Sequence, residues 1–136
     1  MDNDELYTVG DCAVILNSSE FSVRTYINRN EIKALKAGDG KNVPWKVWKS
    51  DLMEFINRNN GVKDKDINND ELYTINDCCV VLRSSITTVK KWLKSNELKS
   101  FKLGSGVRPI RRIWKSDLLE FINKRSNMDE LEKKND

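Results

Sequence analysis

The chain has 136 residues, 38% of them hydrophobic and 33% charged, with a formal net charge of +3. This composition is typical of a globular protein with a polar, solvent-exposed surface. No apolar run approaches the roughly 20 residues of a membrane span, and the acidic start, Met1 to Glu5, lacks the basic and apolar regions of a signal peptide. The sequence therefore predicts a cytoplasmic protein.

The residue types for common catalytic and metal sites are scarce. There is no histidine, so the commonest general base is missing, and no carboxylate pair has a spacing that indicates catalysis. The three cysteines form no C-x-x-C pair and no second cluster, which a zinc site requires. We expect a non-enzymatic protein without metal or cofactor, with Cys12 and Cys78 as small buried hydrophobes in a reducing compartment.

The chain contains an internal repeat. Adding 66 to a residue number carries residues 3–58 onto residues 69–124 without a gap, and about half of the paired positions are identical. Two copies are too few for a solenoid. The sequence therefore predicts two tandem small domains, 3–58 and 69–125, joined by a polar linker, 59–68, and followed by a disordered tail, 126–136.

Two helices are predicted at the start of each repeat. Thr8 is a good N-cap, with Asp11 three positions later in a capping-box arrangement, and apolar residues then recur at helical spacing. Ser19 offers a second N-cap, so a second helix is predicted to run to about Arg29. Two helices joined by a turn of about three residues make a helix-turn-helix. The equivalent residues of the second repeat are Thr74, Asp77, Ser85 and Ser95.

A β-hairpin and a third helix are predicted to follow. Residues 34–37 are short enough for a strand, residues 38–40 suit a tight loop, and residues 45–48 can return as the paired strand. Ser50 is predicted to cap the last helix, as is Ser116 in the second repeat. The predicted fold class is mainly α with small β-hairpin wings, arranged as two tandem winged helix-turn-helix domains.

Five motifs occur in the same order in both repeats: L-Y-T-x-x-D-C-x-V-x-L, S-S-x-x-x-V, N-E-[IL]-K, G-x-G and W-K-S-D-L-x-E-F-I. Over nearly all of each repeat they resemble the excisionase-type winged helix of the MerR-like superfamily. Residues 88–93 are also similar to the corresponding helix of phage excisionases. The resemblance implies sequence-specific binding of double-stranded DNA, with the second helix in the major groove and the wing at the minor groove or phosphate backbone.

The exposed face of the second helix is the predicted DNA contact, because its apolar face is docked on the domain. The resemblance places base-reading roles at Ser22, Thr25, Thr88 and Lys91, with Arg24 and Lys90 nearer phosphate. The other candidates are Asn28, Thr87 and Lys94 on the helices, and Lys46, Arg108, Arg111 and Arg112 in the wings.

The two repeats differ in charge. Residues 3–58 carry no net charge, residues 69–125 carry +6, and the tail carries −2. Neutralising phosphates releases counterions, so we expect the second repeat to be the stronger electrostatic DNA binder. Because the recognition faces differ, the sequence predicts a non-palindromic site.

Three functions remain open on these observations. The first is an excisionase-like DNA architectural factor that assists a recombinase or integrase of a mobile element, and the second is a MerR-like transcriptional regulator on the same fold. The third is an adaptor whose neutral first domain, with Phe21 exposed, binds a protein while the second domain binds DNA.

Two pairs of apolar residues depart from the family pattern. Val14, Val80, Trp48 and Trp114 stand where the family is usually polar or often basic. One hypothesis is that they form a contact between the two domains or between copies of the chain. The alternative is that each tryptophan shields the last helix of its own domain.

Overall fold

The computed structural model describes residues 4–60, 69–105 and 110–126. The chain divides into two compact units, the first of residues 1–69 and 102–110, and the second of residues 70–101 and 111–136. Arg108, linker residues 61–68 and tail residues 127–136 lie outside the described residues. Within the described ranges, no helix is both long enough and apolar enough to cross a membrane.

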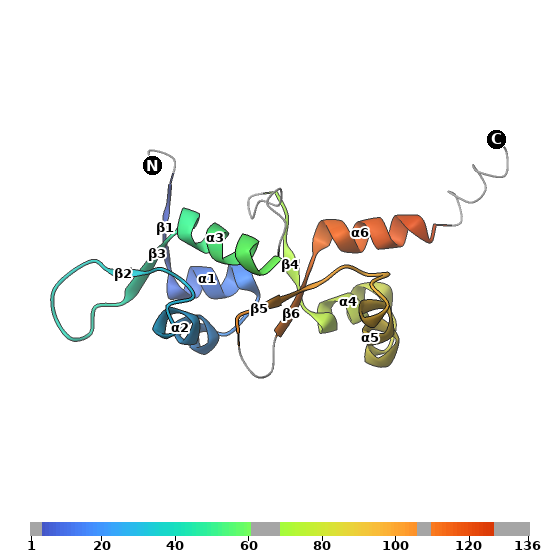
Figure 1. Ribbon diagram of the computed structural model, residues 1–136, viewed down its shortest axis with the longest axis horizontal. Helices are drawn as coiled ribbons and strands as arrows, with labels where there is room; N and C mark the ends of the chain where they lie inside the picture. Colours follow the sequence, from blue (N-terminus) through green and yellow to red (C-terminus); the bar gives the residue numbers. More distant parts are fainter. Residues whose placement is uncertain (1–3, 61–68, 106–109, 127–136) are drawn as a thin grey trace. The chain divides into compact units, whose positions relative to one another are not determined.

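Both repeats have the same order of elements: strand, two helices, two strands, helix (Figure 1). The elements of the first repeat are β1 (Leu6–Thr8), α1 (Val9–Leu16), α2 (Glu20–Asn28), β2 (Leu35–Lys36), β3 (Trp45–Trp48) and α3 (Lys49–Asn60). Those of the second are β4 (Leu72–Tyr73), α4 (Ile75–Leu82), α5 (Ile86–Lys94), β5 (Phe101–Leu103), β6 (Ile110–Trp114) and α6 (Lys115–Lys124). The described part is thus mainly helical with small antiparallel sheets, as predicted. The last helix of the first repeat includes Asn59 and Asn60, which the sequence had assigned to the linker.

The predicted caps set the start of the first two helices. The Thr8 hydroxyl accepts a hydrogen bond from the Asp11 amide at 3.0 Å, and the Asp11 carboxylate accepts one from the Thr8 amide at 3.0 Å. This capping box satisfies two amides that have no partner inside the helix. The second repeat has the same box at Thr74 and Asp77, and Ser19 and Ser85 cap the second helices.

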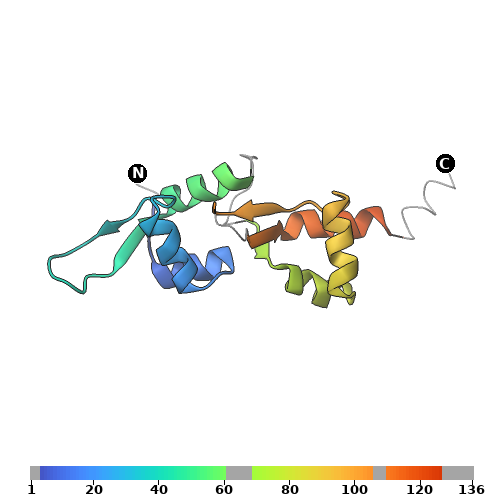
Figure 2. The ribbon, with the colours of Figure 1, turned by 60° about the horizontal axis from the view of Figure 1, so that its bottom comes forward.

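A tight turn joins the first two helices of each repeat. The residue after α1, Asn17, adopts a left-handed backbone with φ of 53°, and Arg83 after α4 has φ of 50°. This conformation ends a helix, and the next amide, that of Ser18, donates back to the Ala13 carbonyl at 2.9 Å. The second helix then lies across the first, as Figure 2 shows for α4 and α5.

Each small sheet contains a strand that the sequence did not predict. β1 pairs antiparallel with β3, with Leu6 opposite Trp48, and β2 pairs with the other edge of β3, giving the order β1-β3-β2. The second sheet has the order β4-β6-β5. The sequence did not predict β1 or β4 because a strand of two or three residues is too short to show an alternating pattern. The predicted two-stranded wing is therefore one part of a three-stranded sheet.

The predicted capping roles of Ser50 and Ser116 are wrong. α3 begins at Lys49 and α6 at Lys115, so each serine lies inside the first turn of its helix. The Asp70 carboxylate instead accepts hydrogen bonds from the Ser116 amide at 3.1 Å and the Ser116 hydroxyl at 2.5 Å. Asp4 bonds Ser50 in the same way. A carboxylate is favoured at a helix N-terminus, and here it comes from 46 residues earlier in the chain.

The core of each repeat lies between the three helices and the sheet. In the first repeat the ring centroids of Tyr26 and Phe55 are 5.1 Å apart, and in the second those of Trp92 and Phe121 are 5.0 Å apart. The second core is built from Cys78, Val89, Leu93, Leu98, Ile113, Leu118 and Phe121. Docking one side of α2 or α5 on its core leaves the opposite side of the helix exposed.

The carboxylates at the helix starts make stability depend on pH. Hydrogen bonds from Thr8 hold the pKa of Asp11 below its usual value, and those from Ser50 do the same for the pKa of Asp4. Such a group stabilises the fold above its unfolded pKa, and this contribution is lost as the pH falls through its folded pKa. We expect the urea midpoint to drop as the pH falls below about 4, and to drop less in Asp11→Asn. An identical pH profile for this variant would contradict the prediction.

Candidate nucleic-acid interface

α5 presents three lysines on the side opposite its core residues. Val89 and Leu93 are buried, whereas Lys90, Lys91 and Lys94 are exposed. Residues three and four positions apart are neighbours on a helix surface, so the three ammonium groups share one face. Among the described residues, no carboxylate forms an ion pair with any of them. These charges are therefore available to an anion in solution.

The start of α5 adds hydroxyl groups to this face. Thr87 is exposed, and the Thr88 hydroxyl lies 2.9 Å from the hydroxyl of Ser85, the cap of the helix. A hydroxyl has one donor and two acceptor positions, so one internal bond leaves Thr88 able to make another. The predicted residues Thr87, Thr88, Lys90, Lys91 and Lys94 are thus brought together on one helix.

On α2, the face that corresponds to the lysine-bearing face of α5 makes contacts within its own helix. Arg24 Nη2 lies 3.4 Å from Glu20 Oε1 in an ion pair between side chains that are each 55% exposed. The Thr25 hydroxyl donates to the Phe21 carbonyl at 2.9 Å. α2 therefore offers fewer uncommitted donors than α5. Of the remaining predicted residues on this helix, Ser22 is half-buried and Asn28 is exposed.

Three predicted wing cations that the structure describes, Lys46, Arg111 and Arg112, are less exposed than the lysines of α5. Arg111 is half-buried and its Nη1 donates to the Ser100 hydroxyl at 2.9 Å. Arg112 is only 6% exposed, and its Nη1 donates to the Arg111 carbonyl at 2.7 Å. Lys46, the counterpart of Arg112 in the first repeat, is half-buried. Their roles as DNA contacts stay predictions, and the main accessible cluster of predicted cations among the described residues is on α5.

A hollow of about 580 Å³ in the first unit lies between α2, the start of α1 and the wing. Its cationic lining consists of Arg24, Lys36 and Lys46, and Glu20 supplies a carboxylate. The Lys36 ammonium lies 4.8 Å from the centre of the Trp45 ring, a cation–π contact that positions the amine and leaves it charged. Sequence reasoning missed Lys36, because its partner lies on the other strand of the wing.

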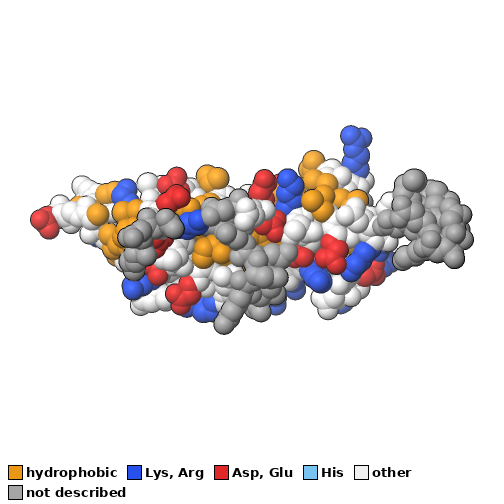
Figure 3. All heavy atoms as spheres, turned by 90° about the horizontal axis from the view of Figure 1, so that it is seen from above, with side chains coloured by type: hydrophobic (Ala, Val, Ile, Leu, Met, Phe, Trp, Pro, Cys, Tyr) orange, Lys and Arg blue, Asp and Glu red, His pale blue; other side chains and the backbone are white. Residues whose placement is uncertain are grey.

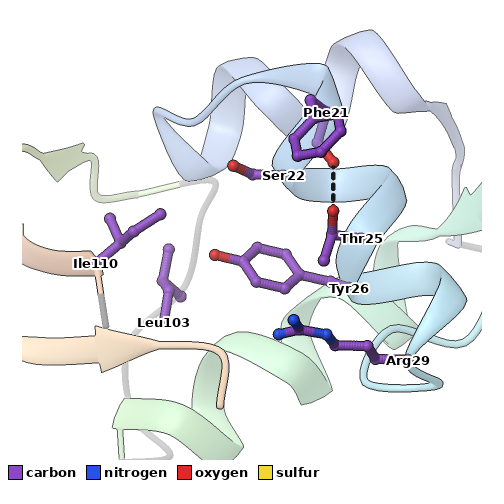
Figure 4. A pocket seen from close by; sticks show the side chains of 7 residues that line it. All are labelled: Phe21, Ser22, Thr25, Tyr26, Arg29, Leu103 and Ile110. Atoms are coloured by element: carbon purple, nitrogen blue, oxygen red, sulfur yellow. Dashed lines mark hydrogen bonds between the residues drawn. The ribbon is translucent and has the colours of Figure 1, made fainter. Parts of the chain in front are cut away.

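A smaller pocket of about 150 Å³ also lies in the first unit. Its lining is Phe21, Ser22, Thr25, Tyr26, Arg29, Leu103 and Ile110 (Figure 4). In the same unit the Gly104 amide donates to Asn59 Oδ1 at 3.1 Å, with φ of 76° at Gly104. A Cβ there would lie 2.5 Å from Cε1 of Tyr26, so both the backbone and the space require glycine. The sequence did not predict this pocket.

The apolar residues that depart from the family pattern separate into two groups. Val14 and Val80 are 81% and 76% exposed. Trp48 is half-buried, and Trp114 is buried with its ring 5.9 Å from that of Phe101. The valines are therefore surface residues, whereas Trp114 packs within its own unit. On the face drawn in Figure 3, apolar side chains are interspersed with basic and acidic ones.

The prediction that Cys12 and Cys78 are buried is confirmed, and burial raises the pKa of each thiol to about 12. Only the thiolate is strongly nucleophilic. We therefore expect an alkylating reagent at about pH 8 to modify the half-buried Cys79 first and to spare the other two in the folded protein. Mass spectrometry should show all three labelled in urea. Labelling of Cys12 as fast as Cys79 in buffer would contradict this.

Comparison with known families finds a match, which falls on the second repeat. Residues 72–126 match a family described as Helix-turn-helix domain. No curated protein and no solved structure matches the chain at a significant level. The matched segment contains α4, the lysine-bearing α5 and α6. The C-terminal part of the chain is therefore similar to a helix-turn-helix domain, which supports the resemblance to excisionase-type proteins and suggests DNA binding.

Proposed function

We propose that this protein is a non-enzymatic, sequence-specific binder of double-stranded DNA. The observation that carries the proposal is the face of α5, where exposed lysines lie opposite residues docked in the core and form no ion pair with any residue that the structure describes. This face lies inside the segment that matches the helix-turn-helix family. An α-helix fits the B-DNA major groove, where each base pair presents a distinct pattern of donors and acceptors.

The side chains of α5 are proposed to have two roles, contact with base edges and contact with phosphates. Lys91 can donate to the O6 and N7 acceptors of guanine, and the Thr88 hydroxyl can donate or accept at a base edge. Lys90 and Lys94 are placed to neutralise phosphates, which supplies affinity without sequence information. The proposal therefore assigns specificity mainly to Thr88 and Lys91.

The first repeat is proposed to be a second winged helix-turn-helix that binds DNA more weakly. Its order of elements is the same, but it has no net charge and its recognition helix carries an internal ion pair. Linking the two sites raises the effective concentration of the weaker one. Because α2 and α5 differ, the expected binding site is non-palindromic, and a footprint with strict two-fold symmetry would count against a tandem reader.

The proposed biological class is an excisionase-like architectural factor that assists a recombinase or integrase, by resemblance of both repeats to that family. A MerR-like transcriptional regulator on the same fold is the alternative. A test is excision by a recombinase encoded beside this protein, with and without it, on DNA that carries the selected site. Stimulated excision favours the architectural role, and binding at its own promoter without any effect on excision favours the regulator.

The adaptor alternative is favoured by one observation on α2. Phe21 is 77% exposed on a helix of a repeat with no net charge. An exposed aromatic residue is a typical anchor at a protein interface. Phe21→Ser should then abolish co-purification of a protein partner and leave DNA binding by α5 unchanged.

Self-association is also part of the proposal, through the exposed Val14 and Val80. Sedimentation equilibrium of the full chain should show an assembly that the double variant Val14→Glu, Val80→Glu dissociates. A wild-type chain that stays monomeric at high concentration, alone and on DNA, removes this element.

Selection of bound sequences from a library of random double-stranded DNA tests the proposal that the protein binds DNA sequence-specifically. The full chain should enrich a defined sequence, and the affinity for it should fall steeply with salt because phosphate contacts release counterions. Failure to bind any duplex in dilute buffer would refute DNA binding.

A further inference from the structure

Glu20 lies among the cations that the first unit offers to an anion. It is the first residue of α2, and its carboxylate pairs with the guanidinium of Arg24 one turn later. Both residues line the hollow between α2 and the wing, together with Lys36 and Lys46. An anion that approaches Arg24 inside the hollow therefore also meets the carboxylate.

The second repeat supplies an internal comparison. At the position of Glu20 it has Ile86, which is 46% exposed, and at the position of Arg24 it has Lys90, which has no ion-pair partner among the described residues. α5 has no acidic residue in its first turn and still forms a nine-residue helix behind the Ser85 cap. An acid at this position is therefore not needed to begin the helix, although it does favour the positive end of the helix dipole.

We propose that Glu20 is a specificity determinant that keeps the first unit from binding DNA phosphates indiscriminately. This rests on the proposed function of the chain as a DNA-binding protein. The carboxylate competes with phosphate for Arg24 and repels any phosphodiester that enters the hollow. A repulsive group of this kind disfavours all DNA equally, so only a site that offers further contacts to α2 retains the first unit.

With this carboxylate in only one of the two copies, the two units should bind DNA unequally. The second unit attaches to any duplex through the exposed lysines of α5, while the first binds only where base contacts offset the repulsion. Its affinity for non-specific DNA should therefore be limited by one carboxylate rather than by the fold.

The experiment exchanges the residue between the repeats in the full chain. Glu20→Gln and Glu20→Ile remove the carboxylate from α2, and Ile86→Glu places one four residues before Lys90. The matched controls are Glu54→Gln on α3 and Leu119→Glu on α6, which change the net charge equally at exposed positions outside the predicted interface. The probe is a random-sequence duplex, titrated over a range of salt concentrations.

We expect Glu20→Gln to tighten binding about three- to tenfold at low salt and to steepen the salt dependence by about one counterion, as one more phosphate contact would do. Glu20→Ile should act in the same direction. Ile86→Glu should weaken binding by a similar factor and flatten the slope. Each control should change affinity less than its partner variant.

Two results would overturn the inference. If Glu20→Gln and Glu54→Gln have equal effects, net charge alone matters; if Glu20→Gln changes thermal stability and not DNA affinity, Glu20 serves only the helix. In both results the wild-type chain still binds DNA, so the proposed function stands. A wild-type chain that binds no duplex at low salt would remove the proposed function, and this inference with it.

Discussion

Changing Lys90 and Lys91 together to alanine should weaken binding to the selected DNA site by about 1 to 3 kcal/mol for each base edge that the variant no longer reaches. Both side chains are exposed and have no ion-pair partners among the described residues, so the change should remove few contacts within the fold. Alanine is the best helix former, which leaves α5 folded. The double change should also flatten the salt dependence, because fewer phosphates are neutralised. Gel-shift titrations at several salt concentrations measure both effects.

The matched control for this prediction is the double change Arg24→Ala, Thr25→Ala at the equivalent positions of α2. Arg24 is already paired with Glu20, and the Thr25 hydroxyl is bonded to its own helix. The decrease in affinity should therefore be clearly smaller than for the lysines. Equal decreases from both repeats would refute the asymmetry between them.

Changing Phe55 to alanine should lower the free energy of unfolding of the first unit by about 3 to 5 kcal/mol. Phe55 is 1% exposed and packs against the ring of Tyr26, so its removal leaves a cavity under α2. A folding unit of this size has only about 5 to 15 kcal/mol of stability at best, and the change consumes much of it. Urea denaturation followed by circular dichroism should show an earlier transition.

Leu119→Ala is the control for the core change. Leu119 is 48% exposed on α6, and a surface substitution of this kind is expected to shift stability by about 0.5 kcal/mol or less. If Phe55→Ala unfolds at the wild-type urea concentration, the arrangement of the first core is wrong.

The two repeats share the residues that build the fold and differ on the exposed face of the second helix. The residues that build the fold recur, including the capping box that opens the first helix, the aspartate that bonds the last helix, and the aromatic pair in the core. The outward residues of the second helix differ, with Glu20, Arg24 and Thr25 in one copy and Ile86, Lys90 and Lys91 in the other. Folding constrains the buried and capping positions most strongly, so the exposed face can differ between the repeats without loss of the fold.

Features that depend on neighbours in the chain were predictable from the sequence. The Thr8 and Asp11 capping box spans three residues, and the apolar spacing of α2 and α5 placed their outer faces correctly. The lysines of α5 were identified as exposed from this spacing alone. The helix-turn-helix and the difference in charge between the repeats follow from such local patterns and from counting.

Features that join distant parts of the chain required the folded structure. The bonds from Ser50 to Asp4 cross 46 residues, the short strand β1 exists only through its pairing with β3, and Lys36 meets Trp45 only when the wing closes. Packing also left Arg112 with little exposure, which no local pattern indicates. Contacts between residues one helical turn apart can be predicted from the sequence because their geometry is nearly constant. Contacts between distant segments depend on how whole helices and strands pack, which the sequence pattern does not show.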